Sequence, residues 1–217
     1  MHMEIKRTAN AGILLRLDGI SVLLDGVCNE VGPYLKTPDR LRMELLNTPA
    51  DVIAFTHAHD DHYDASFVSN YLKNTAGPVL GPADIPLCDQ MPCRIGNVQI
   101  TPVRTRHLGK ADPIDHVSYV IEGSVCIWFM GDASPLSMAA LSDLRQPDVI
   151  VAPYAYATAG GWEITKKIAP KGLIVLHLPE RGNDPFDLWG QVETTVGKDR
   201  SIGVYIPGMG QKICFAQ

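Results

Sequence analysis

The segment THAHDDH at residues 56–62 follows directly on VIAF, the apolar run at residues 52–55. The apolar run predicts a short buried strand, and in extended backbone His57 and His59 project to the same side. A single pair of histidines is more typical of a solvated polar loop. Three imidazoles and a carboxylate within six residues are too many for one tetrahedral zinc and suit two neighbouring ions of zinc, iron or manganese. The segment therefore predicts a metal site.

Other groups that can bind a metal follow three further apolar runs, at the points where strands are expected to end. Residues 98–103 lead toward His107, residues 125–130 end in Gly131 and Asp132, and residues 173–176 are followed by His177. Functional sites in α/β folds collect at strand ends, because loops there carry side chains without disturbing the core. Four such strand ends predict one shared site.

The chain around these ends reads as a mixture of strands and helices. Residues 12–17 and 20–24 are apolar runs separated by Asp18-Gly19, a hairpin signal. Asp64 is a plausible N-cap of a helix that Gly77 and Pro78 stop. Residues 77–102 are rich in Gly and Pro, and we expect short strands and turns there.

The second half alternates strands and helices more regularly. Predicted strands lie at residues 98–103, 117–121, 125–130, 149–152, 173–176, 202–206 and 212–215. Predicted helices run from the N-cap Ser134 to about Leu144, over residues 162–169, and from the N-cap Asp184, with Pro185 at the first position, to Gly197. No linker, repeat or low-complexity tract interrupts the pattern, so we expect one α/β domain over residues 1–217.

Composition excludes several classes of protein. The 217 residues are 46% hydrophobic and 20% charged, which is near average and argues against a disordered or coiled-coil chain. The net charge of −5 disfavours a nucleic-acid binder with a broad basic face, and no apolar run is long enough to span a bilayer. The five cysteines are odd in number and lack a Cys-x-x-Cys pair, which is typical of reduced thiols in a cytoplasmic protein. The expected partner is a small molecule that could be anionic, because a mildly acidic chain can still hold a small anion at one local site.

The run at residues 57–62 resembles the His-x-His-x-Asp-His motif of the metallo-β-lactamase-fold hydrolases, which are metal-dependent enzymes. That superfamily continues with a His after a third strand, an Asp in a Gly-Asp context and a last His after a late strand. Those elements occur here in the same order, and residues 5–25 look like its opening strands. The resemblance implies a four-layer αβ/βα sandwich. It also implies a first metal site formed by His57, His59 and His107, a second formed by Asp61, His62 and His177, and Asp132 bridging both.

This resemblance implies two divalent ions, zinc in the first place and Mn²⁺ or Fe²⁺ as alternatives. A hydroxide bridging the ions would attack a small ester, lactone or phosphodiester, with Asp61 and Asp132 as the catalytic carboxylates. Residues 160–177 look like the ascorbate-6-phosphate lactonase branch, in which a helix precedes Pro-Lys and a strand that ends in His. The alternatives are an iron-dependent redox enzyme of the same fold and a non-catalytic metal-binding protein.

Two further residues have open interpretations. Asp25 closes an early strand, and it either orients a metal-bound imidazole by accepting its N–H or simply ends a hairpin. His116 competes with His107, but it is better explained as the residue at which a strand begins, with a place near the substrate pocket as the alternative. With His2, it is expected to lie outside the site.

Aromatic and basic residues near the expected site have ordinary explanations. Tyr154 and Tyr156 follow a predicted strand where a substrate could bind, and Trp162 begins a helix, but packing is the default role of such side chains. Four basic residues could hold a phosphate or carboxylate, although surface solvation is their default: Arg104, Arg106, Lys110 and Arg181.

Overall fold

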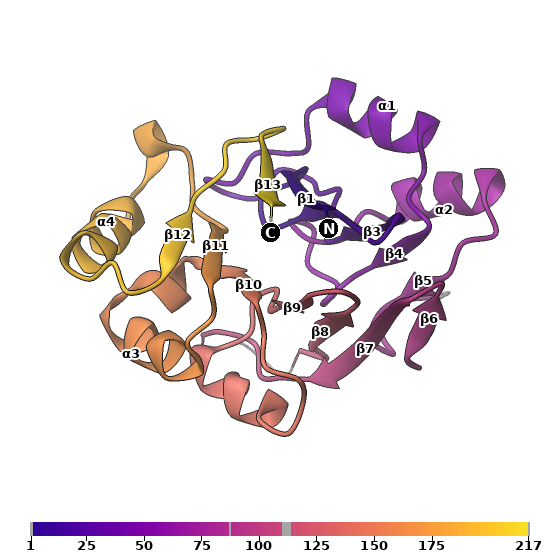
Figure 1. Cartoon of the computed structure of the whole chain (residues 1–217). Coiled ribbons are helices and arrows are strands. Elements are labelled where there is room, and N and C mark those ends of the chain that lie inside the picture. The colour runs from indigo at the N-terminus through magenta and orange to yellow at the C-terminus, as the bar shows by residue number, and fades with distance from the viewer. Residues whose placement is uncertain (1, 87, 110–113, 217) are drawn as a thin grey trace.

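Two β-sheets form the centre of the protein in a computed structural model that describes residues 2–86, 88–109 and 114–216 (Figure 1). The first sheet has the strand order β13-β1-β2-β3-β4-β5, and the second has the order β12-β11-β10-β9-β8-β7-β6. The strands of the first sheet are β1 (His2–Arg7), β2 (Ile13–Leu17), β3 (Ile20–Leu24), β4 (Val52–Ala54), β5 (Val79–Leu80) and β13 (Lys212–Ala216). Those of the second are β6 (Cys93–Ile95), β7 (Val98–Arg104), β8 (Val117–Glu122), β9 (Cys126–Phe129), β10 (Val149–Pro153), β11 (Gly172–Leu176) and β12 (Gly203–Tyr205).

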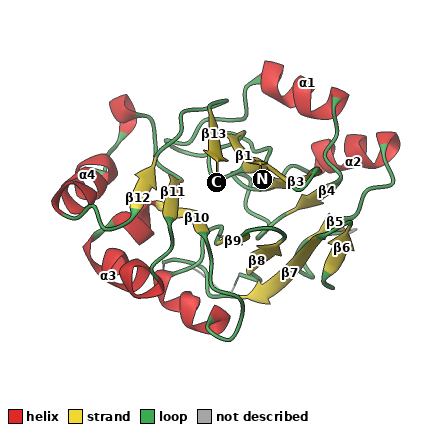
Figure 2. Ribbon diagram, viewed as in Figure 1, coloured by secondary structure: helices red, strands yellow, loops and turns green. Residues whose placement is uncertain are grey.

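Helices cover the outer face of each sheet (Figure 2). On the first sheet these are α1 (Asp39–Asn47) and α2 (Ala65–Asn74), and on the second α3 (Ala159–Ile168) and α4 (Leu188–Lys198). Three short 3₁₀ helices complete the second half, η1 (Pro135–Leu141), η2 (Tyr154–Ala157) and η3 (Arg181–Asn183). Among the described residues, no helix is long and apolar enough to cross a membrane.

Strand alternation divides the core into three apolar layers. On β9, Ile127 and Phe129 pack between the two sheets, while Trp128 faces the other way, toward the helices. On β2, Leu15 faces the second sheet and Leu14 packs under α2. Because successive residues of a strand point to opposite faces, each sheet buries both of its faces. These layers confirm the predicted αβ/βα sandwich.

The local signals for the hairpin and for α2 are confirmed. Strands β2 and β3 pair antiparallel across Asp18 and Gly19, which have φ angles of 51° and 83°. The Asp64 carboxylate caps α2 by accepting from the Phe67 N–H at 2.8 Å. Burial alone would raise the pKa of Asp64, but hydrogen bonds from Arg42, from the side chain of Ser66 and from this N–H lower it to about 2.

Two predicted helix boundaries are wrong. The segment after Ser134 forms a 3₁₀ helix that ends at Leu141, and the Ser134 side chain makes no capping hydrogen bond. Helix α4 begins at Leu188 rather than at Pro185, because Asp187 adopts a left-handed φ of 52° that interrupts helical backbone. The Asp184 carboxylate nevertheless accepts from the N–H groups of Leu188 and Trp189, so it caps the helix from a greater distance along the chain.

Helix α1 was not predicted. It buries only Leu41 and Leu45, and its N-cap, Pro38, makes no side-chain capping bond. The segment therefore lacks both the apolar stripe and the capping residue by which a helix is recognised in a sequence.

Candidate metal centre

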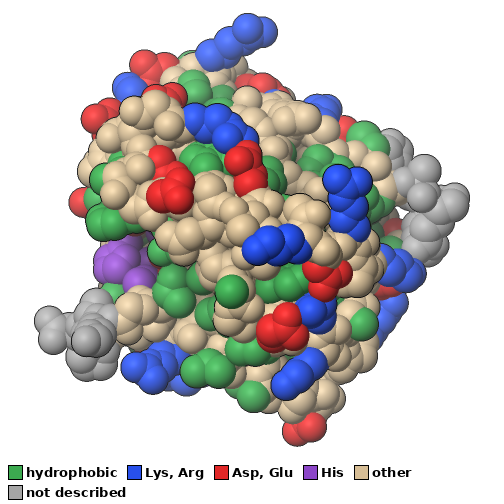
Figure 3. All heavy atoms as spheres, turned by 90° about the vertical axis from the view of Figure 1, so that its left-hand side faces the viewer, with side chains coloured by type: hydrophobic (Ala, Val, Ile, Leu, Met, Phe, Trp, Pro, Cys, Tyr) green, Lys and Arg blue, Asp and Glu red, His purple; other side chains and the backbone are tan. Residues whose placement is uncertain are grey.

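The seven side chains predicted to bind metal converge from the loops that follow four strands. These loops follow β4, β7, β9 and β11. The donor atoms form three groups, each with all atoms within 4.8 Å of one another: His57, His59 and His107; His57, His62 and Asp132; and Asp61, His62 and His177. Histidine side chains reach the surface on one face of the molecule (Figure 3). The groups share His57 and His62, so they form one continuous centre.

The first group presents ring nitrogens to a common point. The Nε2 atom of His57 lies 2.9 Å from Nδ1 of His59. The ring centroid of His107 lies 4.8 Å from that of His57 and 5.0 Å from that of His59. The outer nitrogens of two rings have partners, since His57 Nδ1 donates to Thr56 Oγ1 at 3.0 Å and His107 Nδ1 donates to the Leu108 carbonyl at 2.6 Å. These bonds leave the Nε2 lone pairs free for a metal.

The second and third groups together bring the carboxylates of Asp61 and Asp132 close to two imidazoles, without hydrogen bonds between them. His177 Nε2 lies 3.2 Å from Oδ2 of Asp61 and 3.2 Å from Oδ2 of Asp132, and His62 Nε2 lies 3.4 Å from Oδ1 of Asp132. Among the described residues, both Nε2 atoms and Asp132 Oδ1 are buried without a hydrogen-bond partner, as is Nε2 of His107. Buried polar atoms normally have partners. A cation among these atoms would supply the missing partner, so the residues fit a metal.

The electrostatics divide the centre into two parts. Burial and the neighbouring His62 lower the pKa of His57 far below its usual range. Burial also opposes a charge on His62 and His177, but the Asp132 carboxylate outweighs it and raises the pKa of both, that of His177 to about 9. The carboxylates thus favour positive charge at the second and third groups, which is the condition for holding a cation there.

Asp25 orients the centre through hydrogen bonds to residues of the segment that carries the histidines. This residue is fully buried and accepts three hydrogen bonds, from Thr56 N–H at 2.7 Å, from Thr56 Oγ1 at 2.6 Å and from His62 Nδ1 at 2.8 Å. The bond from His62 fixes the tautomer in which Nε2 carries the lone pair. Of the two interpretations left open by the sequence, the structure supports the acceptor for a ligand imidazole.

Gly131 gives Asp132 its position. Its φ is 54°, in the left-handed region, and a Cβ there would lie 2.5 Å from the side chain of Thr56. Only glycine fits both restrictions. The Gly-Asp pair at the end of β9 therefore brings the Asp132 carboxylate against the segment that carries His57.

His116 contacts the centre, contrary to the expectation that it lies outside. Its ring centroid is 5.1 Å from that of His57, and its Nε2 accepts the backbone N–H of Asp132 at 3.1 Å. The opposite nitrogen, Nδ1, donates to Thr105 Oγ1 at 2.8 Å, and Thr105 in turn contacts Ser118 Oγ at 2.9 Å. Burial lowers the pKa of His116 to about 3, so it is neutral and can accept this bond. His116 thus holds Asp132 through its backbone.

We expect His116→Phe to weaken metal binding by about 10–100-fold, as loss of a residue that orients a ligand typically does. The phenyl ring leaves the Asp132 N–H buried without an acceptor. His116→Gln offers an amide oxygen instead and should retain most of the affinity. Competition with a chromogenic chelator measures the affinity, and circular dichroism checks that both variants fold. Equal metal affinity in a folded His116→Phe variant and in the parent would contradict the role.

Three tyrosines near the centre differ in burial and in their contacts. Tyr156 is buried and donates to the Ser134 carbonyl at 3.2 Å, so it packs in the core. Tyr154 is half-buried, and burial together with the charge of Asp132 raises its pKa, which keeps the phenol neutral. Tyr34 had no signal in the sequence, yet its ring packs edge-on against His177 with centroids 4.4 Å apart.

The remaining candidates do not join the centre. Trp162 is buried in the layer beneath α3. Arg104 is exposed and pairs with Asp115 at 3.2 Å, and Arg181 is exposed and pairs with Glu193 at 2.7 Å. Arg106 is exposed too, and Lys110 lies outside the described residues.

Comparisons with known proteins identify the family to which the chain belongs. Residues 4–177 match the family model described as "Beta-lactamase superfamily domain". A UPF0173 metal-dependent hydrolase of Cupriavidus taiwanensis is 26% identical over 230 residues, which cover 85% of this chain and 79% of the relative. The family model thus extends from β1 to the last of the seven side chains, His177.

Solved structures share the fold at low sequence identity. An isothiocyanate hydrolase from Delia radicum gut bacteria has a TM-score of 0.73 at 14% identity, covering 98% of this chain and 99% of the other. Igni18, a novel metallo hydrolase from Ignicoccus hospitalis, has a TM-score of 0.70 at 15% identity, covering 100% of both chains. CmlA, a diiron beta-hydroxylase from Streptomyces venezuelae, has a TM-score of 0.68 at 13% identity, covering 99% of this chain and 54% of the other. At these identities the likeness shows the fold alone.

Proposed function

The chain belongs to the beta-lactamase superfamily, and from this membership and its cluster of donor atoms we propose that it is a metal-dependent hydrolase of small esters, lactones or phosphodiesters. One observation carries the proposal. Buried nitrogen and oxygen atoms of His62, His107, Asp132 and His177 approach one another without hydrogen bonds, as ligands of shared cations do. The name of the Cupriavidus taiwanensis relative supports hydrolysis as the reaction.

In this proposal two divalent ions occupy neighbouring positions, with zinc as the first candidate. His57, His59 and His107 would hold one ion, Asp61, His62 and His177 would hold the other, and the Asp132 carboxylate, which is grouped with His57 and His62, would be available to either. When bound, the ions lower the pKa of water so that hydroxide is present near neutral pH.

Asp61 is the residue that accepts a proton. Burial acts to raise its pKa, but the nearby imidazoles of His177 and His62 lower it below its usual range, so the carboxylate is ionised at neutral pH. Tyr154 follows β10 and is half-buried with a neutral phenol, so its hydroxyl would be able to donate a hydrogen bond to a substrate bound there. Asp132 holds His62 and His177 in place through its charge.

The test is hydrolysis of a panel by the protein loaded in turn with Zn²⁺, Mn²⁺ and Fe²⁺. The panel contains neutral lactones, carboxylated lactones, a phosphorylated sugar lactone, aryl esters and phosphodiesters. Turnover of at least one class that a chelator abolishes supports the proposal, and preference for the phosphorylated lactone would support the ascorbate-6-phosphate lactonase branch. Metal-loaded protein that hydrolyses no member would instead favour a non-catalytic metal-binding protein.

A redox enzyme is the second candidate. The observation that favours it is the mixture of imidazole and carboxylate donors, which also suits iron, together with the fold shared with a diiron beta-hydroxylase. Metal analysis of protein purified without oxygen separates the two functions. Two irons per chain with oxygen consumption, and no hydrolysis, would replace the hydrolase proposal.

Removing the metal is expected to lower the melting temperature by about 5–10 °C. A ligand at 100 times its Kd stabilises a fold by about 2.7 kcal/mol, and each kcal/mol moves the Tm of a chain this long by about 2–4 °C. Differential scanning calorimetry with and without a chelator measures the shift. His59→Ala, which lacks one donor, serves as the matched variant and should show a smaller shift. An identical Tm with and without chelator in the parent would mean that metal binding does not support this fold.

A further inference from the structure

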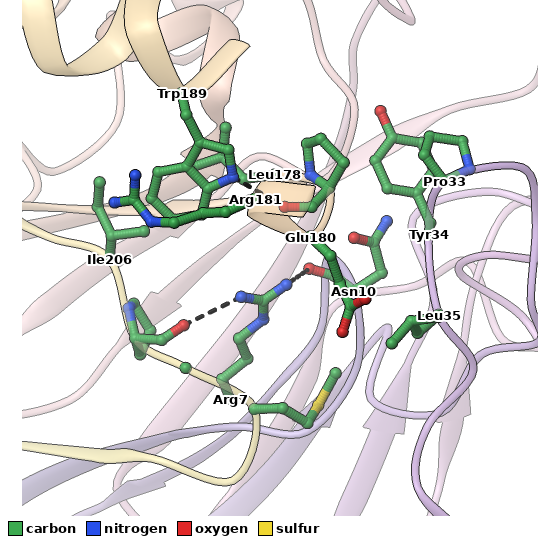
Figure 4. Close-up of a pocket in the computed structure, with 14 residues that line it drawn as sticks. Arg7, Asn10, Pro33, Tyr34, Leu35, Leu178, Glu180, Arg181, Trp189 and Ile206 are labelled. Atoms are coloured by element: carbon green, nitrogen blue, oxygen red, sulfur yellow. Dashed lines mark hydrogen bonds between the residues drawn. The ribbon is translucent and has the colours of Figure 1, made fainter. Parts of the chain in front are cut away.

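A cavity of about 210 Å³ is lined in part by Tyr34 (Figure 4), whose ring packs against that of His177 in the metal centre. Its wall is mostly apolar and includes Leu35, Leu178 and Trp189. Two buried polar side chains also line it, Arg7 and Asn10, which come from the end of β1 and the turn that follows. Neither has a role in the proposed metal site.

Arg7 is a buried cation without an anion. Its side chain donates to three backbone carbonyls, from Nε to Ala9 at 3.2 Å, from Nη1 to Pro207 at 3.0 Å and from Nη2 to Asn10 at 3.1 Å. A guanidinium has five N–H groups, so one on each terminal nitrogen remains unused. No carboxylate among the described residues lies within 4.0 Å of it, and Glu180, which lines the same cavity, is exposed. Burying an unpaired charge is costly unless a ligand compensates it.

Asn10 adds a second unused donor. The residue is 2% exposed, and its Nδ2 atom is buried without a hydrogen-bond partner among the described residues. Its backbone carbonyl accepts from Arg7 Nη2 at 3.1 Å, so the two residues adjoin in the wall of the cavity (Figure 4). A buried N–H donor without an acceptor costs about 1–3 kcal/mol. A ligand with negatively charged oxygens would satisfy both Arg7 and Asn10.

The cavity is joined to the metal centre through one carbonyl group. The Asn10 carbonyl accepts from Arg7 Nη2 and also from the backbone N–H of His177, at 3.2 Å. Tyr34 lines the cavity and packs against the ring of His177 at the same time. Tyr34 and the Asn10 backbone therefore lie between the cavity and His177, so the cavity borders the metal centre.

We infer that this cavity binds an anionic group, a carboxylate or a phosphate, of the molecule that is hydrolysed at the metal centre, with Arg7 and Asn10 as its donors. The inference rests on the proposed function for the identity of the reaction but not for the binding of the anion. The apolar wall accommodates the part of the substrate that links the anionic group to the bond that is cleaved.

The binding experiment titrates metal-loaded protein with inorganic phosphate and, separately, with acetate while tryptophan fluorescence is recorded. Trp189 lines the cavity, whereas Trp128 and Trp162 are buried in the core, so the signal reports mainly on the cavity. The first variant is Asn10→Asp, which is nearly isosteric, keeps the backbone carbonyl and adds a competing carboxylate. The second is Arg7→Gln, and the matched control is Arg104→Gln, whose arginine is exposed and paired with Asp115.

We expect the Kd of the preferred anion to rise more than tenfold in Asn10→Asp and in Arg7→Gln and to stay within twofold in Arg104→Gln. The anion that binds more tightly identifies the group as phosphate or carboxylate. Phosphate also binds to divalent ions, but binding there does not depend on Asn10. An anion affinity that Asn10→Asp leaves unchanged, or absence of a signal for both anions, therefore overturns the inference even if Arg7→Gln fails to fold.

A matched pair of substrates separates this inference from the proposed function. The pair is a carboxylated lactone and its neutral methyl ester, and the expected result is a KM ratio that favours the acid and disappears in Asn10→Asp. Hydrolysis of both members with equal KM rejects the anion subsite and leaves the hydrolase proposal intact. Hydrolysis of neither member, with anion binding that still depends on Asn10, rejects the hydrolase and leaves the anion subsite intact.

Discussion

Asp132→Ala is expected to lower kcat of the metal-dependent reaction by at least about 10³-fold, equivalent to about 4 kcal/mol of barrier, while the chain stays folded. The Asp132 carboxylate is common to both parts of the centre. Its Oδ1 lies 3.4 Å from His62 Nε2, and its Oδ2 lies 3.2 Å from His177 Nε2 and 3.7 Å from His107 Nε2. In the proposed metal site, its loss would remove one negative ligand from the bound cations, so their positive charge would be less well compensated.

Steady-state kinetics with the best substrate of the panel, together with metal analysis, measures this effect. Asp60→Ala is the matched control, because Asp60 lies in the same motif but is exposed and outside the three donor groups. We expect that control to keep kcat within about threefold of the parent, as exposed substitutions away from a site usually do. Undiminished turnover by metal-replete Asp132→Ala would remove the carboxylate from the mechanism.

The sequence predicts the part of the centre that depends on short-range order. His57 and His59 follow a buried strand at a spacing of two residues, and Asp64 caps the helix after them. Both features come from backbone periodicity and local hydrogen bonding, which the sequence contains directly. His177 was indicated by its place directly after the apolar run at residues 173–176, whereas His107 lies farther from its strand and was assigned from its order along the family pattern.

Residues whose roles depend on contacts between distant segments were assigned wrongly or missed. His116 directly precedes β8, and what gives it a role is its contact with the N–H of Asp132 after the next strand. Tyr34 and Arg7 lie in or beside loops, and their positions depend on packing against His177 and on the carbonyl of Pro207, 200 residues away. Neither periodicity nor capping signals report such contacts.

The same explanation holds for α1 and α4. Helix α1 forms because Leu41 and Leu45 are buried, and Lys6 of β1 pairs with Glu44 of this helix at 2.6 Å. Helix α4 starts late because Asp187 takes a left-handed conformation before it. Tertiary contacts decide whether α1 forms, and a single backbone angle decides where α4 begins. Helix propensity alone could therefore predict neither feature.

Asp25 connects the fold to the centre, because one buried carboxylate accepts from both Thr56 and His62. It lies just after β3, and its backbone N–H donates to the carbonyl of Ala54 at 2.9 Å, at the end of the neighbouring strand β4. The Oγ1 atom of Thr56 also accepts from the ring Nδ1–H of His57. Asp25 therefore orients the imidazole of His62 directly and that of His57 through Thr56. Loss of that side chain affects the stability of the strand ends and the geometry of the ligands together.

We expect Asp25→Ala to lower the free energy of unfolding by about 3–5 kcal/mol, the usual cost of removing one partner from a buried charged pair, and metal affinity by about 10–100-fold. Urea unfolding and chelator competition measure the two effects. Asp25→Asn keeps a residue that tolerates the left-handed φ of 45°, but its amide turns an N–H toward one of the hydrogen-bond donors. We therefore expect Asp25→Asn to lose metal affinity but to lower the free energy of unfolding less than Asp25→Ala does. Asp51→Ala is the matched control, because Asp51 accepts from Ser21 at the other end of β3 and is exposed. If Asp25→Ala were no more destabilising than Asp51→Ala, Asp25 would only end the hairpin, because no imidazole would depend on it.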